Sequence, residues 1–247
     1  MVKIVPTPDW FLGKDVLIET FSFVVLFLFS FLSIKNYRVN RNRRFLYLGV
    51  GFGLIALAQL ASILTKTVLY YDFGPTQEIG RAIVTSQVVS SVDIFYYTGF
   101  FFQRFLTLIG FYIIYRLPRE KKSIGDYLLV GYFILLSALL SNEISFLFHL
   151  TALFLLIMIT GNYYEIYKQN KFFNTKILMI SFGILAFSQV LFMFSEVDAL
   201  YVAGNIIELI SYTIFLGLII RIRKYGKKKK PYGYNIRHAG DDSGKGR

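Results

Sequence analysis

Eight polar side chains interrupt long apolar stretches of this chain, and their types suit them for chemistry inside a membrane. Three of these side chains carry a charge, one is an imidazole and four are amides. Within a bilayer such groups avoid lipid and face a bundle interior or a water-filled cavity, where they pair, bind solutes or relay protons. The sequence therefore predicts a polar pocket lined by Glu19, Gln59, Gln103, Arg104, His149, Gln189, Asn205 and Glu208.

Counting along the apolar stretches places Arg104 and Glu208 near the midplane of the membrane. A charged residue there costs about 3 kcal/mol on insertion scales, so Arg104 requires a partner. Glu208 is the predicted partner because it matches in depth and charge. The pair would form the floor of a pocket that opens outward, with either an architectural or a functional role.

The other polar residues each have two interpretations. The glutamines either line the pocket or form interhelical hydrogen bonds worth about 0.6 kcal/mol each. His149 either senses pH or simply holds a hydrogen bond. Asn205 lies one turn before Glu208, and Tyr201 and Tyr212 extend the same helical stripe, which is either a pocket wall or a packing face.

The elements that must position these residues are membrane helices. The 247 residues are 55% hydrophobic with a mean hydropathy of +0.53, which is too apolar for a soluble domain of this length. Apolar runs long enough to cross a bilayer recur throughout the chain. We predict an all-α, polytopic protein with seven transmembrane helices, at 16–34, 45–65, 94–115, 126–141, 144–164, 177–195 and 199–220.

Basic residues predict the orientation of these helices. The chain carries 27 Lys and Arg residues and a net charge of +12. Most of them fall in 35–44, 116–122, 168–176 and the segment from Arg221 onward. Because cytoplasmic loops are enriched in Lys and Arg, the N-terminus is predicted outside and the C-terminus in the cytoplasm, which an odd number of spans satisfies. The charge is then a topology signal, and nucleic acid is not an expected partner.

One stretch of the chain occurs twice. Residues 51–60 (GFGLIALAQL) match residues 181–190 (SFGILAFSQV) at four identical positions, and the same offset of 130 aligns 37–41 with 167–171. A match at one fixed offset predicts an internal repeat. Two three-helix units in the same orientation would then be joined by a linker helix, an arrangement that often places a site between the halves. The repeat pairs Glu19 with His149, Gln59 with Gln189 and, at an offset of 105, Gln103 with Glu208.

These patterns divide the chain into segments. The predicted order is an outer N-terminal segment, a first unit with a long outer loop, a linker helix, a second unit and a basic cytoplasmic tail without a packed fold. The tail is polybasic, and we expect it to bind anionic headgroups through Lys227, Lys228, Lys229 and Lys230. The five segments are the outer N-terminal segment 1–15, the first unit 16–115 with its loop at 66–93, the linker helix 126–141, the second unit 144–220 and the tail 221–247.

Several kinds of chemistry find no support in the sequence. Cysteine is absent, His149 and His238 are the only histidines, and no lysine lies between 199 and 220. Thiolate, bis-histidine haem and retinal Schiff-base sites are therefore not expected. No spacing marks a nucleophile with its base. We expect no catalytic residue, metal or cofactor, and no enzymatic activity.

Two resemblances bear on function. SFGILAFSQ followed by LYVAGNIIELISYTIFLGLIIRIRK, within residues 177–224, resembles the last two helices of uncharacterised archaeal seven-helix membrane proteins. Those proteins are similar to the seven-helix input modules of sensor kinases, which implies a sensory or accessory role. The order of three, one and three helices also resembles the SWEET sugar transporters in architecture. SWEET helices hinge at prolines, whereas the prolines here, at 6, 8, 75, 118 and 231, lie outside every predicted span.

The leading hypothesis is a non-enzymatic protein of the cell membrane that senses or binds a small ligand from outside. Its signal would pass to a separate membrane or cytoplasmic partner through the inner loops and tail. The first alternative is a small-solute or ion-coupled transporter. The second is a structural subunit of a membrane complex, in which the polar residues only hold helices together.

Overall fold

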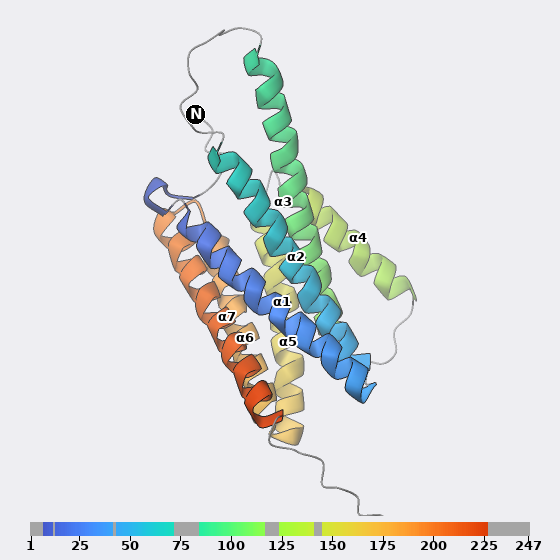
Figure 1. The fold of residues 1–247 in the computed structure, drawn as a ribbon. Helices are drawn as coiled ribbons and strands as arrows, with labels where there is room; N and C mark the ends of the chain where they lie inside the picture. Colours follow the sequence, from blue (N-terminus) through green and yellow to red (C-terminus); the bar gives the residue numbers. More distant parts are fainter. Residues whose placement is uncertain are drawn as a thin grey trace, which may run out of the picture.

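The chain folds into a bundle of helices, as its apolar runs predict. The computed structural model describes residues 7–11, 13–41, 43–71, 84–116, 124–140 and 145–226, and these ranges contain no β-strand. The elements are a short 3-10 helix η1 (Asp9–Phe11) and the helices α1 (Lys14–Asn40), α2 (Arg43–Tyr71), α3 (Val84–Arg116), α4 (Ile124–Leu140), α5 (Ser145–Asn170), α6 (Phe173–Phe192) and α7 (Asp198–Gly226) (Figure 1).

Six of the helices are long and apolar enough to cross a membrane, which fits a multi-pass integral membrane protein. The helix α4 is the short member, with 17 residues. At 1.5 Å per residue it is roughly 26 Å long, slightly less than the ~30 Å hydrocarbon core. The six spans are Lys14–Val39, Phe45–Val68, Tyr97–Arg116, Ser145–Asn170, Phe173–Phe192 and Asp198–Ile222.

Several helices extend beyond the apolar runs that predicted them. The outer loop expected at 66–93 is shorter, because α2 continues to Tyr71 and α3 already begins at Val84. Residues 72–83 lie outside the described ranges. Similarly, α1 begins at Lys14, and α7 continues to Gly226 inside the predicted tail. The thickness of the hydrocarbon core sets the length only of the apolar part of a helix. Hydropathy therefore does not predict the polar turns by which a helix continues at either end.

The helices pack in two similar groups (Figure 1). In the first, α1 packs on α2 and α2 on α3; in the second, α5 packs on α6 and α6 on α7. The groups meet where α1 packs on α7 and where α3 packs on α5. The helix α4 lies outside the other six, against α3 and α5. Each group therefore contributes one wall of a common interior.

Aromatic rings fill the centre of that interior. The ring of Phe52 on α2 stacks at 6.0 Å on that of Phe182 on α6, between centroids. Phe215 on α7 meets both rings edge-on, at 5.5 and 5.2 Å. Phe29 on α1 lies 4.4 Å from Phe52. All four side chains are buried, so this cluster joins the two groups of helices.

The stretches that resemble each other in sequence also share local structure. Along 51–64 and 181–194, the order of buried, intermediate and exposed side chains is the same at every position. The helices α1 and α5 end alike, because Arg41 and Lys171 both adopt a positive φ, of 53° and 51°. Their backbone N–H groups donate to Tyr37 and Tyr167 at 2.8 and 2.7 Å. This left-handed conformation is uncommon for residues other than glycine.

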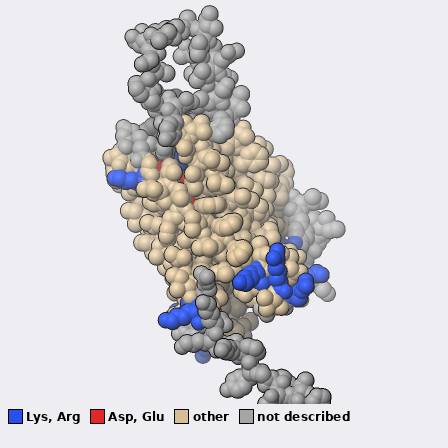
Figure 2. All heavy atoms as spheres, in the orientation of Figure 1, with Lys and Arg blue, Asp and Glu red and all other residues tan. Residues whose placement is uncertain are grey.

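Basic side chains gather at one end of the bundle (Figure 2). It is the end where α1, α3, α5 and α7 finish and where α2 and α6 start. Among the described acidic side chains, only Glu165 lies there. We call it the basic end. Its described basic residues are Lys35, Arg38, Arg41, Arg43, Arg116, Lys168, Lys171, Lys176, Arg221 and Lys224.

The close contact between α2 and α3 depends on glycine. A Cβ at Gly110 would lie 2.8 Å from the carbonyl oxygen of Gly51 and 2.5 Å from Cγ1 of Ile55. We expect Gly110→Ala to lower the free energy of unfolding by about 1–3 kcal/mol, because the backbone oxygen of Gly51 cannot move away from the added methyl group without separating the two helices. SDS-driven unfolding in mixed micelles would measure the change. Gly217→Ala on α7 is the matched control, since nothing lies within 4 Å of its Cβ. Equal stability of the two variants would contradict the close α2–α3 approach.

Candidate functional site

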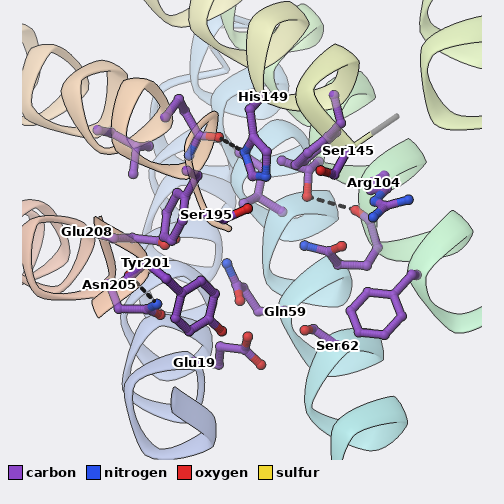
Figure 3. A pocket seen from close by; sticks show the side chains of 18 of the residues that line it. Glu19, Gln59, Ser62, Arg104, Ser145, His149, Ser195, Tyr201, Asn205 and Glu208 are labelled. Carbon is purple, nitrogen blue, oxygen red and sulfur yellow. Dashed lines mark hydrogen bonds between the residues drawn. The ribbon is translucent and has the colours of Figure 1, made fainter. Parts of the chain in front are cut away.

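A cavity of about 330 Å³ lies between α1, α2, α3, α5, α6 and α7. It occupies the half of the bundle opposite the basic end, where α1, α5 and α7 begin and α2 and α6 finish. The structure places every residue of the predicted polar pocket on its wall (Figure 3). They are Glu19 on α1, Gln59 on α2, Gln103 and Arg104 on α3, His149 on α5, Gln189 on α6, and Asn205 and Glu208 on α7.

A buried lysine, Lys66, forms the ion pairs at the end of the cavity where α1 begins and α2 finishes. The ammonium of Lys66, on α2, donates to Asp15 Oδ2 at 2.8 Å and to Glu19 Oε1 at 2.6 Å. The side chain of Lys66 is only 6% exposed, that of Asp15 is fully buried, and that of Glu19 is 15% exposed. One cation thus shares two carboxylates of α1 in a place with little solvent. The ion triad of Asp15, Glu19 and Lys66 fastens the start of α1 to the end of α2.

Residues 7–11, before α1, pack beside this triad. The hydroxyl oxygen of Thr7 lies 3.3 Å from Asp15 Oδ2 and 3.1 Å from the hydroxyl of Tyr201, and its single proton serves one of these two partners at a time. Phe11, in η1, is buried and meets the ring of Tyr201 edge-on at 6.4 Å. It also belongs to a small apolar cluster with Phe192. The N-terminal segment is therefore bound to α1 and α7 at the mouth of the cavity.

His149 lies on the α5 wall and is hydrogen-bonded. Its Nδ1 is 2.9 Å from Oε1 of Gln189 on α6, so this nitrogen carries the proton if the amide is oriented as drawn. The imidazole stacks on Phe192 at 5.4 Å. This geometry agrees with the simpler of the two interpretations from sequence, a histidine held by one hydrogen bond.

The α7 wall carries a polar stripe that includes one carboxylate, that of Glu208. Oε1 of Glu208 accepts a hydrogen bond of 3.0 Å from the hydroxyl of Tyr212, one turn further along. Asn205, one turn earlier, donates from Nδ2 to the backbone oxygen of Tyr201 at 2.9 Å, which leaves its Oδ1 as an acceptor. Tyr201 and Tyr212 both line the cavity and both belong to packed apolar clusters, so the stripe is a pocket wall and a packing face together.

The predicted pairing of Arg104 with Glu208 is not formed. Both ion pairs recorded among the described residues belong to Lys66. The guanidinium of Arg104 lies 5.9 and 6.0 Å from the ring centroids of Phe100 and Phe148. Figure 3 places Arg104 on the α3 wall and Glu208 on the α7 wall. The prediction was wrong because α3 packs on α2, α4 and α5, whereas α7 packs on α6 and α1.

The floor of the cavity is apolar rather than charged. Four buried residues line it directly above the central aromatic cluster: Ile55, Phe111, Leu185 and Tyr212. Ile55 and Leu185 occupy equivalent positions at the offset of 130, as do Gln59 and Gln189 one turn above. The polar side chains therefore form a ring over an apolar base.

Sequence reasoning missed Lys66 and Asp15. The first span was predicted to begin at 16 and the second to end at 65, so both fell just outside. Extending each predicted helix by one turn would have found them. Asp15 and Glu19 are four residues apart, and Gln59, Ser62 and Lys66 lie on one face of a helix. The offset of 130 also places Lys66 opposite Glu196, which lines the same cavity. Other lining residues missed are Ser62, Thr107, Ser145 and Ser195.

Within the described residues, no group of three or more His, Cys, Asp or Glu is arranged to hold a metal ion. The predicted headgroup-binding lysines, Lys227–Lys230, lie outside the described ranges. The cavity combines carboxylate, amide and aromatic side chains, a mixture that is typical of pockets for small molecules.

No protein-family model matches the chain, and no curated protein or solved structure is significantly similar to it.

Proposed function

We propose that this protein is a membrane receptor that binds a small polar solute in the cavity and does not transform it. The observation that carries the proposal is the shape of the site, a polar ring from six helices over an apolar floor. A volume of about 330 Å³ lies at the small end of the usual range for ligand pockets. A solute of roughly a dozen heavy atoms would fill it.

The closed base supports binding rather than passage. Phe52, Phe182 and Phe215 are fully buried beneath the cavity, and they interlock edge-on and face-to-face. No proline interrupts any described helix, so none of them has the usual cause of a sharp hinge. Transport would require this packed layer to open.

The proposed topology puts the cavity on the outer side. With the basic end in the cytoplasm, the N-terminus and the ion triad face outward. The helix α4 then serves as a seventh span, thinning the bilayer slightly to match its length. Ligand binding would be passed to a separate partner through the inner loops and the basic tail. This role also agrees with the resemblance of residues 177–224 to sensory seven-helix modules.

We propose further that the two helix groups arose by duplication. The similar sequences, the burial pattern and the positive-φ helix ends all repeat at the same offset of 130, which supports duplication. The contact of α1 with α7 also matches that of α5 with α3. The stacked rings of Phe52 and Phe182 occupy equivalent positions and touch each other. Contact between equivalent residues is what a two-fold axis along the membrane normal produces. The cavity would lie on that axis.

A thermal-shift screen tests the receptor proposal. Purified protein is scanned against ions, sugars, amino acids, amines and lipids between pH 5 and 8. A true ligand at 100 times its Kd is expected to stabilise the protein by about 2.7 kcal/mol. Gln103→Ala should remove most of that shift, because its amide lines the cavity. Gln169→Ala, an exposed glutamine at the basic end, is the matched control and should keep it.

A hit that shifts both variants equally would place the ligand elsewhere and contradict the receptor proposal. Silence of the wild-type protein across the whole panel would favour the structural-subunit alternative. The tail would then be used to capture a protein partner.

Transport is the second candidate, favoured by the arrangement of two similar groups around a central site. It predicts flux of the ligand across proteoliposomes. A receptor binds the ligand without flux, so a hit from the screen separates the two.

A further inference from the structure

The charges of the cavity wall are unevenly distributed, and the imbalance points to a ligand class. In the ion triad, Glu19 and Lys66 line the cavity, and Asp15, fully buried behind them, is a second carboxylate on the same cation. Glu208 has no ion pair among the described residues, and its recorded hydrogen bond comes from the neutral hydroxyl of Tyr212. The wall made by α1 and α7 therefore carries more negative than positive charge.

Hydrogen-bonding capacity on this wall is also one-sided. Oε2 of Glu19 is buried and has no hydrogen-bond partner within the described part of the chain. Glu208 uses one oxygen for Tyr212, and Asn205 uses its amide nitrogen on a backbone oxygen. The oxygens left over on this wall are acceptors, and a buried acceptor without a donor costs about 1–3 kcal/mol. A ligand that brings N–H donors would satisfy them.

Figure 3 shows Glu19, Asn205 and Glu208 on the same side of the cavity, with Tyr201 between them. The side made by α3 and α5 is mixed. Gln103, Arg104 and His149 lie on it together with the rings of Phe100 and Phe148, and Phe111 lies at the floor. The α1–α7 wall thus suits a charged donor, and the phenylalanine rings offer an apolar surface to the rest of a ligand.

From this juxtaposition we infer that the cavity binds a small organic cation, a protonated amine whose ammonium group meets Glu19, Asn205 and Glu208 and whose hydrocarbon part lies against the phenylalanines. An ammonium supplies three N–H donors and one positive charge, which are what the α1–α7 wall lacks. The guanidinium of Arg104 lies on the opposite wall, 5.9 and 6.0 Å from the ring centroids of Phe100 and Phe148, so the ammonium is placed at the α1–α7 wall and away from it. The inference rests on the proposed receptor function.

Three probes of one shape test the ligand class. The amine is 2-phenylethylamine, the neutral analogue is 2-phenylethanol, and the anion is 3-phenylpropionate. Isothermal titration into the purified protein in neutral detergent, with empty micelles subtracted, gives each Kd. We expect the amine to bind about tenfold or more tightly than the alcohol, because a hydrogen bond to a charged group is worth roughly 1.5–3 kcal/mol. The carboxylate should bind most weakly.

A matched pair of variants assigns the preference to the wall. Glu208→Gln keeps the size and polarity of the side chain but removes its charge, and should cut the preference for the amine over the alcohol to about threefold or less. Glu165→Gln removes the same charge at the basic end, where the side chain is exposed, and should leave the preference unchanged. If Glu208→Gln does not fold, the ranking of the three probes on the wild-type protein still decides.

The outcomes separate the two proposals. If the alcohol or the carboxylate binds as well as the amine and Gln103→Ala weakens it, the cavity is a binding site but the cationic class is wrong. If none of the three probes binds while a solute without a protonated amine passes the thermal-shift test, the class is again wrong and the receptor proposal stands; a different amine that passes would support the class. If neither the probes nor the solute panel binds, both proposals fall.

Discussion

Replacing Lys66 by methionine is expected to lower the free energy of unfolding by about 3–5 kcal/mol, the largest effect of any single substitution considered. Removing one partner of a buried ion pair leaves the other charge without compensation in a medium of low dielectric constant. Two carboxylates, those of Asp15 and Glu19, share this ammonium, at 2.8 and 2.6 Å. Methionine keeps the length and apolar character of the lysine stem, so packing changes little. SDS-driven unfolding of the purified protein gives the free energy.

Two further variants identify charge as the cause. Lys14→Met removes an exposed lysine near the start of α1, whose ammonium lies 5.4 Å from the ring of Trp10. An exposed contact of this kind contributes about 0.5–1 kcal/mol, so this control should be nearly neutral. The triple change of Lys66→Met, Asp15→Asn and Glu19→Gln removes all three charges at similar volume and should recover most of the loss. A Lys66→Met protein as stable as Lys14→Met would show that the triad is not a buried ionic cluster.

The residues of the pocket could be gathered from sequence because the bilayer constrains them strongly. A polar side chain inside an apolar span has few places to go, and counting along each span gives its depth. Gln59 and Gln189 are an example. The internal repeat predicts that they lie at equivalent positions, and both line the cavity. Depth and polarity are properties of each helix by itself, so one sequence suffices for them.

Pairing between helices is a different kind of information, and there the prediction failed. Arg104 and Glu208 match in depth and in charge, yet they lie on α3 and α7, which do not pack along one another. Which helices are neighbours depends on side-chain packing across the bundle, and apolar membrane helices carry little sequence signal for it. The cation that does bind a carboxylate of the pocket, Lys66, lies where an apolar window ends, so hydropathy assigned it to a loop.

The second large effect is expected in the aromatic layer beneath the cavity. Phe52→Ala and Phe182→Ala should each lower the free energy of unfolding by about 2–3 kcal/mol. Lipid tails are as apolar as the core, so the loss comes from packing rather than from transfer out of water. Removing a phenyl ring opens roughly 100 Å³, and a residual cavity costs about 24 cal/mol per Å³. Phe187→Ala on α6 is the control, because its side chain is 55% exposed toward the lipid face, and its cost should stay below about 1 kcal/mol.

A double-mutant cycle then reports on the contact between the two helix groups. The rings of Phe52 and Phe182 stack at 6.0 Å, so removing both should cost less than the separate losses added together, by about 0.5–1.5 kcal/mol. Duplication adds a sharper expectation, because equivalent residues on a two-fold axis have similar surroundings and should have similar single costs. Additive losses would mean that the rings do not touch across the interface. Coupled losses of very different size would keep the contact but argue against the axis, and with it the central position proposed for the binding site.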